Sequence, residues 1–201
     1  MIVVVDYGVG NLRSVQKGFE KVGYKAIITA DRDILDKADG IVLPGVGAFK
    51  DAANALSKSN LGEAIKEGIA KGKPFLGICL GLHLLFTQSE EHGITQGLDI
   101  IPGRVVSLPL SVKIPHMGWN QIKKIVDAPV LNDINDGSYL YFVHSYHVVP
   151  DDKNIVATTT NYGIEFVSSI WKKNIFASQF HPEKSSKLGL KILKKFGEAT
   201  G

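Results

Sequence analysis

The chain has 201 residues, 44% hydrophobic and 21% charged, which is enough to bury the core of one α/β domain. Its formal net charge of +3 is too small to predict binding to nucleic acid or to an anionic membrane. A single cysteine excludes an internal disulfide, and no apolar run is long enough for a membrane span or a signal peptide. We expect a soluble, cytoplasmic protein with one domain over residues 1–201.

The first half of the chain alternates short apolar runs with helical patterns. Buried strands are expected at residues 2–6, 25–28, 41–43 and 75–78. Amphipathic helices are expected at residues 12–22, 51–57 and 61–71. Strands and helices in alternation predict an open, mostly parallel sheet with helices on both faces.

The second half, from about residue 100, has a different pattern. Strand-like segments separated by short polar turns are expected at residues 138–148, 155–160, 164–171 and 175–180. They predict antiparallel hairpins that complete the sheet. A final amphipathic helix is expected at residues 185–196.

The only cysteine lies where a predicted strand meets a helical pattern. Gly77 and Gly81 flank Cys79 in a Gly-x-Cys-x-Gly frame, the cysteine counterpart of the Gly-x-Ser-x-Gly nucleophile elbow. The glycines permit a tight turn that lifts the sulfur out of the sheet to a helix N-terminus, where the dipole favours a thiolate. The alternative is a buried cysteine that acts as a small hydrophobic residue. The flanking glycines favour the nucleophile.

A nucleophilic thiolate needs a base, and the segment that ends in His181-Pro182-Glu183 offers one. Proline biases His181 toward extended backbone, and in extended chain residues 181 and 183 project to the same side. The carboxylate of Glu183 could then orient the imidazole, as in a catalytic triad. A surface turn without a partner is the alternative.

A third segment offers backbone donors for an oxyanion. Gly45, Val46 and Gly47 follow a buried strand, and the N–H groups of such a loop can point into a cleft. Together with the N–H of Leu80 they would form an oxyanion hole. A simple turn that needs positive φ is the alternative.

Other motifs carry less. Gly8-Val9-Gly10 lacks the third glycine of a dinucleotide-binding fingerprint. His144 and His147 would lie on opposite faces of one strand, so no metal site is expected. Met117 and Trp119 fall in a loop-like segment and belong either to the core or to a partner surface.

The motifs, in this order, resemble class I (triad-type) glutamine amidotransferases, and further segments resemble the glutaminase subunits of imidazole glycerol phosphate synthase. The resemblance runs through the whole chain. The segments that carry it are Asp-Tyr-Gly-Val-Gly-Asn at 6–11, Pro-Gly-Val-Gly-Ala-Phe at 44–49, His-Met-Gly-Trp-Asn at 116–120, Tyr-Phe-Val-His-Ser-Tyr at 141–146 and Gln-Phe-His-Pro-Glu-Lys-Ser at 179–185.

This resemblance implies a flavodoxin-like α/β core and a Cys79–glutamine thioester, without a cofactor or metal. It also implies that ammonia passes to a separate cyclase of (β/α)₈-barrel type, which makes imidazole glycerol phosphate and AICAR in histidine biosynthesis. Substrate-pocket positions fall at Gly47, Leu80, Ser145 and Tyr146, and partner-facing positions at Asn11, Met117, Trp119 and Lys184. His83 departs from the family, because it stands where many amidotransferases have a substrate-binding glutamine.

Three alternative functions stay open. The chain could be the glutaminase of another two-protein amidotransferase, or a catalytically silent interaction subunit of the same fold. It could also be a cysteine hydrolase or peptidase on a flavodoxin-like core. Retention of Cys79, His181 and Glu183 together argues against the silent alternative, and a peptidase would not require the segment 117–120.

Overall fold

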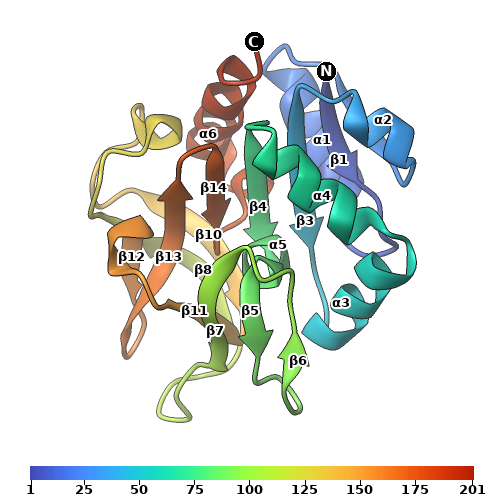
Figure 1. Ribbon diagram of the computed structural model, residues 1–201. Coiled ribbons are helices and arrows are strands. Elements are labelled where there is room, and N and C mark those ends of the chain that lie inside the picture. Colours follow the sequence, from blue (N-terminus) through green and yellow to red (C-terminus); the bar gives the residue numbers. More distant parts are fainter.

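The parallel strands form one side of one large sheet, from its β2 edge inward (Figure 1). The computed structural model describes all 201 residues. Five neighbouring strands run parallel in the order β2 (Ala26–Thr29), β1 (Ile2–Val5), β3 (Gly40–Gly45), β4 (Phe75–Cys79) and β14 (Ile175–Ser178). This is the flavodoxin-like order, so the expected fold class is confirmed.

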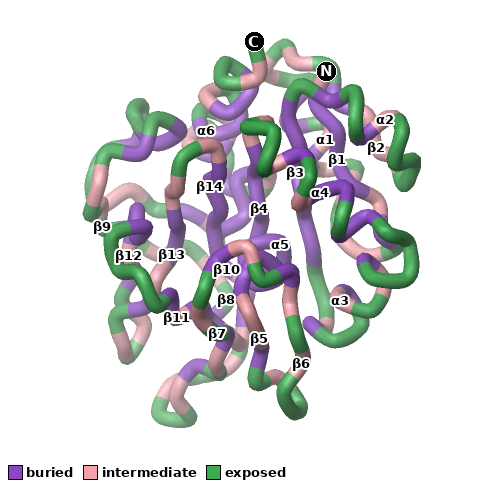
Figure 2. Tube along the Cα trace, viewed as in Figure 1, coloured by how far each residue is buried: buried purple, intermediate pink, exposed green.

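Helices cover both faces of these strands because each strand is apolar on both sides. In β1, Val3 and Val5 belong to one apolar cluster while Ile2 and Val4 belong to another. The first cluster is completed by helices α2 (Arg32–Asp36), α3 (Phe49–Lys58) and α4 (Leu61–Ala70). The second is completed by α1 (Leu12–Lys21) and α6 (Ser186–Glu198). Figure 2 shows the resulting buried centre.

Strands in mostly antiparallel pairs, with one parallel pair among them, extend the sheet beyond β14, as expected for the second half of the chain. They follow in the order β13 (Glu165–Lys172), β11 (Tyr146–Pro150), β7 (Ile101–Ser107), β5 (Phe86–Ser89) and β6 (Thr95–Gln96), with β12 (Val156–Asn161) and β9 (Lys123–Lys124) beside β13. Strand β13 pairs antiparallel with β14, β12 and β11. The sequence patterns did not predict β5, β6, β7, β9 or the short helix α2.

Residues 116–121 form a strand, so the expectation of a loop there was wrong. Strand β8 (His116–Gln121) pairs antiparallel with β10 (Tyr139–His144) in a separate two-stranded sheet. Only His116 of β8 is buried, and Met117 and Trp119 project outward. The apolar side chains therefore face away from the core, which hides the usual strand signal.

The segment expected as one strand over 138–148 is two strands. Ser145 separates β10 from β11, and these strands belong to different sheets. As a result, β10 leaves the main sheet and forms a ribbon with β8, which we call the β8–β10 ribbon.

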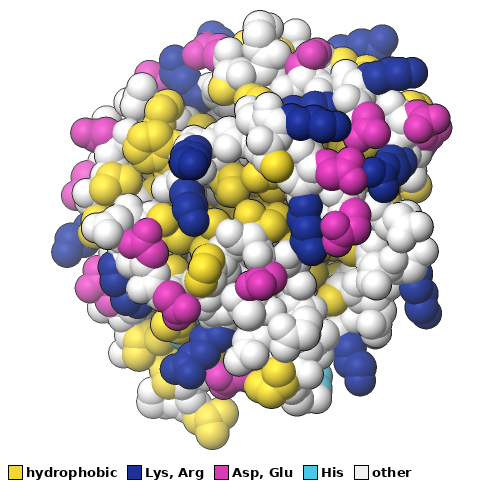
Figure 3. Space-filling model, in the orientation of Figure 1, with side chains coloured by type: hydrophobic (Ala, Val, Ile, Leu, Met, Phe, Trp, Pro, Cys, Tyr) yellow, Lys and Arg dark blue, Asp and Glu magenta, His cyan; other side chains and the backbone are white.

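Surface charge is mixed, in keeping with the small net charge. The face in Figure 3 shows acidic and basic side chains interspersed, without a field of one sign. No helix combines the length and apolar character that crossing a bilayer requires.

The carboxyl ends of β1, β3, β4 and β14 meet at one edge of the sheet because these strands are parallel. The segments that leave these ends carry the Asp6–Asn11, Gly45–Gly47, Cys79 and His181 motifs. Ligand sites of open α/β sheets lie at this edge.

Candidate active site

Cys79 occupies a strained turn between β4 and helix α5 (Leu80–Leu84). Its backbone has φ 54° and ψ −106°, a conformation that is rare for residues other than glycine. A side chain at Gly81 would overlap the carbonyl oxygen of Leu43, and one at Gly77 would overlap the side chain of Ala177. The two glycines therefore permit the close approach of strand and helix that the elbow requires. Helix α5 is only five residues long and contributes little dipole of its own.

His181 and Glu183 form a buried pair. The Nδ1 atom of His181 lies 2.8 Å from Oε1 of Glu183, and both side chains are 2% exposed. Glu183 lies in the 3₁₀ turn η3 (Pro182–Lys184), not in extended chain, so that part of the expectation was wrong. His181 itself is extended, and the turn after it brings the carboxylate back to the ring.

The second nitrogen of His181 faces the charge of Cys79. Burial opposes the charged imidazole, but the charges of Cys79 and Glu183 outweigh it and raise the pKa of His181 to about 10. Nε2 is buried and makes no geometrically aligned hydrogen bond, so its attraction to Cys79 is mainly one of charge. With Nδ1 held by Glu183, Nε2 is the atom available for proton transfer.

A cavity of about 400 Å³ opens onto the sulfur of Cys79. Eight of the site residues predicted from the sequence line it, namely Val46, Gly47, Cys79, Leu80, His83, Ser145, Tyr146 and Lys184. Gly45, His181 and Glu183 do not line the cavity. Ser145 and Tyr146 reach it because the chain breaks between β10 and β11 at this point.

The glycine loop after β3 is anchored by a residue that the sequence patterns did not signal. The hydroxyl of Tyr7 donates to the carbonyl oxygen of Pro44 at 2.8 Å. Burial and, to a smaller extent, the charge of Cys79 raise the pKa of Tyr7 above its usual range, so the hydroxyl remains a donor. A side chain at Gly45 would overlap this hydroxyl and Leu80, while Gly47 adopts φ +95°. The N–H groups of Val46 and Gly47 make no hydrogen bond within the chain.

Four further residues line the cavity and were missed, namely Glu91, Pro115, Val143 and His144. Glu91 follows β5, and its Oε2 accepts a hydrogen bond from the N–H of Phe49 at 2.8 Å. The thiol of Cys79 donates to the carbonyl oxygen of Val143 at 3.7 Å. No local motif marks these residues, because their relation to Cys79 depends on how separate strands pack.

The two neighbouring histidines do not share one strand. His144 ends β10 and His147 lies in β11, so the expectation of opposite faces on one strand was wrong. His144 Nε2 lies 2.8 Å from His116 Nδ1, and this pair joins the two strands of the β8–β10 ribbon. Burial is the main cause that lowers the pKa of His116 to about 4 and of His144 to about 3, so both rings are neutral at physiological pH.

The residues assigned to a partner surface are exposed. Met117 is 62% and Trp119 52% exposed on β8, and Tyr139 on β10 is 53% exposed. Lys184 places its Nζ 5.9 Å from the ring centroid of Tyr141, so it links this surface to the cavity that it also lines. Asn11 is exposed before α1, and its side chain does not cap the helix.

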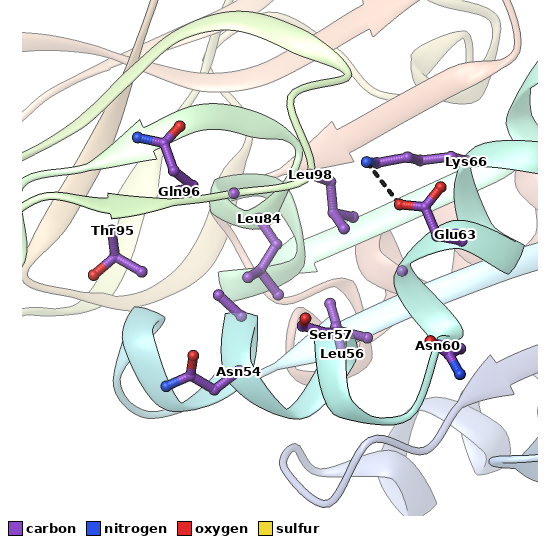
Figure 4. A pocket seen from close by; sticks show the side chains of 13 residues that line it. Asn54, Leu56, Ser57, Asn60, Glu63, Lys66, Leu84, Thr95, Gln96 and Leu98 are labelled. Carbon is purple, nitrogen blue, oxygen red and sulfur yellow. Dashed lines mark hydrogen bonds and ion pairs between the residues drawn. The ribbon is translucent and has the colours of Figure 1, made fainter.

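A second cavity, of about 420 Å³, lies between α3, α4 and β6, away from Cys79 (Figure 4). Its lining is largely amide, hydroxyl and aliphatic, and its charged groups, Glu63 and Lys66, pair with each other at 3.0 Å. It contains no nucleophile paired with a base. The cavity at Cys79 is therefore the better candidate for an active site.

The chain matches a known family and several known proteins. The model of the family "Glutamine amidotransferase class-I" matches residues 3–199. The chain is 55% identical to imidazole glycerol phosphate synthase subunit HisH of Syntrophotalea carbinolica, over 98% of this chain and 100% of that protein. It is 54% identical to the HisH subunit of Aquifex aeolicus, over 96% of this chain and 94% of that protein.

A solved structure supports the fold independently. The glutaminase domain of Trypanosoma brucei CTPS, solved with bound acivicin, superposes with a TM-score of 0.70 at 17% identity, over 99% of this chain and 92% of that one. A family match over nearly all residues, together with relatives above half identity, settles the membership. The chain belongs to the class-I glutamine amidotransferases and, within them, to the HisH subunits of imidazole glycerol phosphate synthase.

Proposed function

We propose that this chain hydrolyses L-glutamine to glutamate and ammonia through a thioester on Cys79, and that it delivers the ammonia to a cyclase subunit of (β/α)₈-barrel type. The cyclase makes imidazole glycerol phosphate and AICAR in histidine biosynthesis. One observation carries the proposal. Cys79 lies on a strained elbow and lines the cavity, and its charge acts on a buried imidazole whose other nitrogen is held by a carboxylate at 2.8 Å.

The first half of the reaction forms the thioester. The Cys79 thiolate attacks the γ-carboxamide carbon, a C–S bond forms, and the carbonyl electron pair moves to oxygen. The N–H groups of Gly47 and Leu80 stabilise this oxyanion, and each donor of this kind is worth about 10²–10³ in rate. His181 donates its Nε2 proton to the amide nitrogen, the C–N bond breaks, and ammonia leaves.

The second half releases glutamate. Neutral His181 takes a proton from water through Nε2, and the hydroxide equivalent attacks the thioester carbon. The C–S bond breaks, glutamate leaves, and the thiolate and imidazolium are restored. Glu183 keeps the imidazole in one orientation through both halves and stabilises its charged form.

The cavity also offers groups suited to the amino-acid end of glutamine. The carboxylate of Glu91 is matched to the α-ammonium group, and the hydroxyl of Tyr146 remains neutral because burial and the charge of Glu91 raise its pKa. His83 lines the same cavity with a neutral ring, since burial lowers its pKa to about 4. These groups supply polar contacts where the family glutamine is missing.

The partner surface follows from the same cavity. Ammonia released into bulk water would be protonated and lost as a nucleophile, so a partner must dock near the cavity. This surface has an apolar centre, formed by the exposed side chains of Met117 and Trp119. Its polar edge is the cation of Lys184, and such a centre and edge are the composition of a protein interface. Asn11 extends this surface.

Reconstitution tests the proposal. The chain is mixed with the cyclase of an imidazole glycerol phosphate synthase, and glutamate release from glutamine is measured with and without the cyclase and its acceptor. We expect the cyclase to be required for full turnover and one imidazole product per glutamate released. Glutamate release that is insensitive to every cyclase, or none with any of them, would contradict the proposal.

A further inference from the structure

Gln179 lies between the proposed nucleophile and His83, and nothing above assigns it a role. It follows β14, two residues before His181, and is fully buried. Its Nε2 lies 3.7 Å from the sulfur of Cys79, and its Oε1 lies 2.7 Å from Nε2 of His83. One amide therefore joins the reacting atom to a residue of the cavity wall.

Besides the charge of His181, the sulfur has few partners with which to stabilise a negative charge. Its contact with Val143 is to a carbonyl oxygen, which accepts from a neutral thiol but repels a thiolate. The amide of Gln179 is the hydrogen-bond donor that contacts the sulfur within this chain. Hydrogen bonds to ionised groups are stronger than those between neutral groups, so this donor matters most when Cys79 is a thiolate.

His83 determines which end of the amide faces the sulfur. A ring N–H pairs with the carbonyl oxygen of Gln179, and the amide nitrogen is then left for the sulfur. A flipped amide would present its oxygen to the thiolate. Burial lowers the pKa of His83 to about 4, so the ring is neutral, and with Oε1 of Gln179 as its neighbour Nε2 is the nitrogen that is assigned the proton. Nδ1 has no partner in the chain and is the acceptor side of a ring that lines the cavity.

We propose that Gln179 is a catalytic residue that donates an N–H to the Cys79 thiolate, and that His83 is a positioning residue that holds this amide in its donating orientation. The proposal rests on the function proposed above for Cys79. It also gives the departure from the family a physical role. The histidine replaces an amide side chain with a ring that has one donor for Gln179 and one acceptor for the cavity.

A purely structural role makes a different prediction. If Gln179 and His83 only satisfied each other inside the core, their loss would lower stability and leave the ionisation of Cys79 unchanged. The catalytic and the purely structural role therefore predict different pH dependences for the reactivity of the Cys79 sulfur. Because Cys79 is the only cysteine, alkylation of the whole protein reports on this sulfur alone.

The experiment measures the rate at which iodoacetamide alkylates this chain against pH in the complex with the cyclase, and the mass of this chain is read separately from that of the cyclase. Gln179→Met keeps the length of the side chain but has no donor. In this variant we expect the midpoint of the curve of alkylation rate against pH to rise by about one pH unit. Below the midpoint this makes alkylation about tenfold slower, since one unit is a factor of ten in thiolate population. Cys79 also influences the pKa of His181 and of Tyr7, and this variant keeps both of these residues.

His83 variants test the positioning step. His83→Phe removes the ring N–H and should also raise the midpoint of the alkylation–pH curve. In the double variant, Gln179→Met should add no further shift to the one that His83→Phe causes. His83→Gln restores a donor to Oε1 and should return the midpoint toward that of the wild type. The kcat for glutamine should fall in Gln179→Met with little change in KM, whereas His83→Phe should change both, because Nδ1 serves the cavity.

Thr158→Val is the matched control, because Thr158 is also a fully buried polar residue, hydrogen-bonded to Ser168 and Ser169. It should lower stability without moving the midpoint. An unchanged midpoint in folded Gln179→Met, or additive shifts in the double variant, would overturn the proposal. Glutaminase activity that survives Cys79→Ala would instead overturn the proposed function, so the two failures are distinct.

Discussion

Trp119 and Tyr141 face each other across the β8–β10 ribbon, and their rings pack edge-to-face with centroids 6.1 Å apart. Trp119 remains 52% exposed in this arrangement, so most of its area is free for a partner. On the other side of the strand, the carbonyl oxygen of Tyr141 accepts a hydrogen bond from the N–H of His181 at 2.9 Å. The exposed surface and the proposed base therefore share one strand.

Trp119→Ala should weaken association with the cyclase and leave the isolated chain nearly as stable as before. A half-exposed side chain leaves no closed cavity when truncated, whereas an aromatic residue central to an interface costs about 2 kcal/mol or more. A binding titration beside a thermal melt checks this. Trp171→Ala removes the only other tryptophan and should leave the affinity unchanged. Undiminished affinity in Trp119→Ala, with a large drop in Tm, would assign Trp119 to the core.

Cys79→Ala should abolish glutamine-dependent activity while the fold and partner binding are retained. Loss of a covalent nucleophile that acts in a triad costs up to about 10⁶ in kcat. Glutamate release by the variant measures the loss. Added ammonium salt should still support the cyclase in the variant complex, because the acceptor reaction needs only ammonia. Failure of that rescue would show that the substitution damaged the complex and not the chemistry alone.

His181 and Glu183 should differ in their contributions. His181→Ala removes the group that protonates the leaving ammonia and activates water, whereas Glu183→Ala leaves the imidazole present but no longer held at 2.8 Å. We expect the larger loss of kcat in His181→Ala. Steady-state kinetics of both variants, with circular dichroism to verify folding, checks the order. Equal and small losses would contradict the triad.

The imidazole of His181 should be charged at neutral pH and lose its proton only in the alkaline range. Its pKa is raised to about 10, with the charge of Cys79 and the pairing with Glu183 overcoming the effect of burial. Protonation persists below a raised pKa, so kcat/KM, which reports on the free enzyme, should fall on the alkaline side as Nε2–H is lost. Nuclear magnetic resonance of labelled histidine follows the titration directly, with His181→Gln to assign the signal.

Cys79→Ala provides the control for this titration. It removes the anion that helps to raise the pKa, so the midpoint of the same signal should move to lower pH. A His181 signal that titrates at the same pH in both proteins would contradict the charge interaction with Cys79.

The elbow, the His-Pro-Glu segment and the glycine loop could be predicted because each is a local sequence pattern, although the chain after His181 turns where extended backbone was expected. Parallel strands then bring their carboxyl ends together whatever the spacing along the chain. Contacts between residues that are far apart along the chain leave no local sequence pattern. Gln179 meets His83 from 96 residues away, and Glu91 reaches the cavity from the turn after an unpredicted strand.

The ribbon was hidden for a related reason. Strand prediction depends on an apolar face directed at the core, and β8 directs Met117 and Trp119 outward. Its inward positions are glycine, asparagine and the buried His116. The apolar side chains of β8 face outward, toward the proposed partner. The sequence pattern of such a strand therefore looks irregular when only its own chain is considered.

Strand β10 contacts both Cys79 and His181 through main-chain oxygens, those of Val143 and Tyr141. Such contacts do not depend on which side chains occupy these two positions. The side chains that face a partner can therefore change in evolution together with that partner. The main-chain contacts with the nucleophile and the base are retained through such changes. Specificity for a cyclase and control of glutamine hydrolysis can evolve separately on one strand.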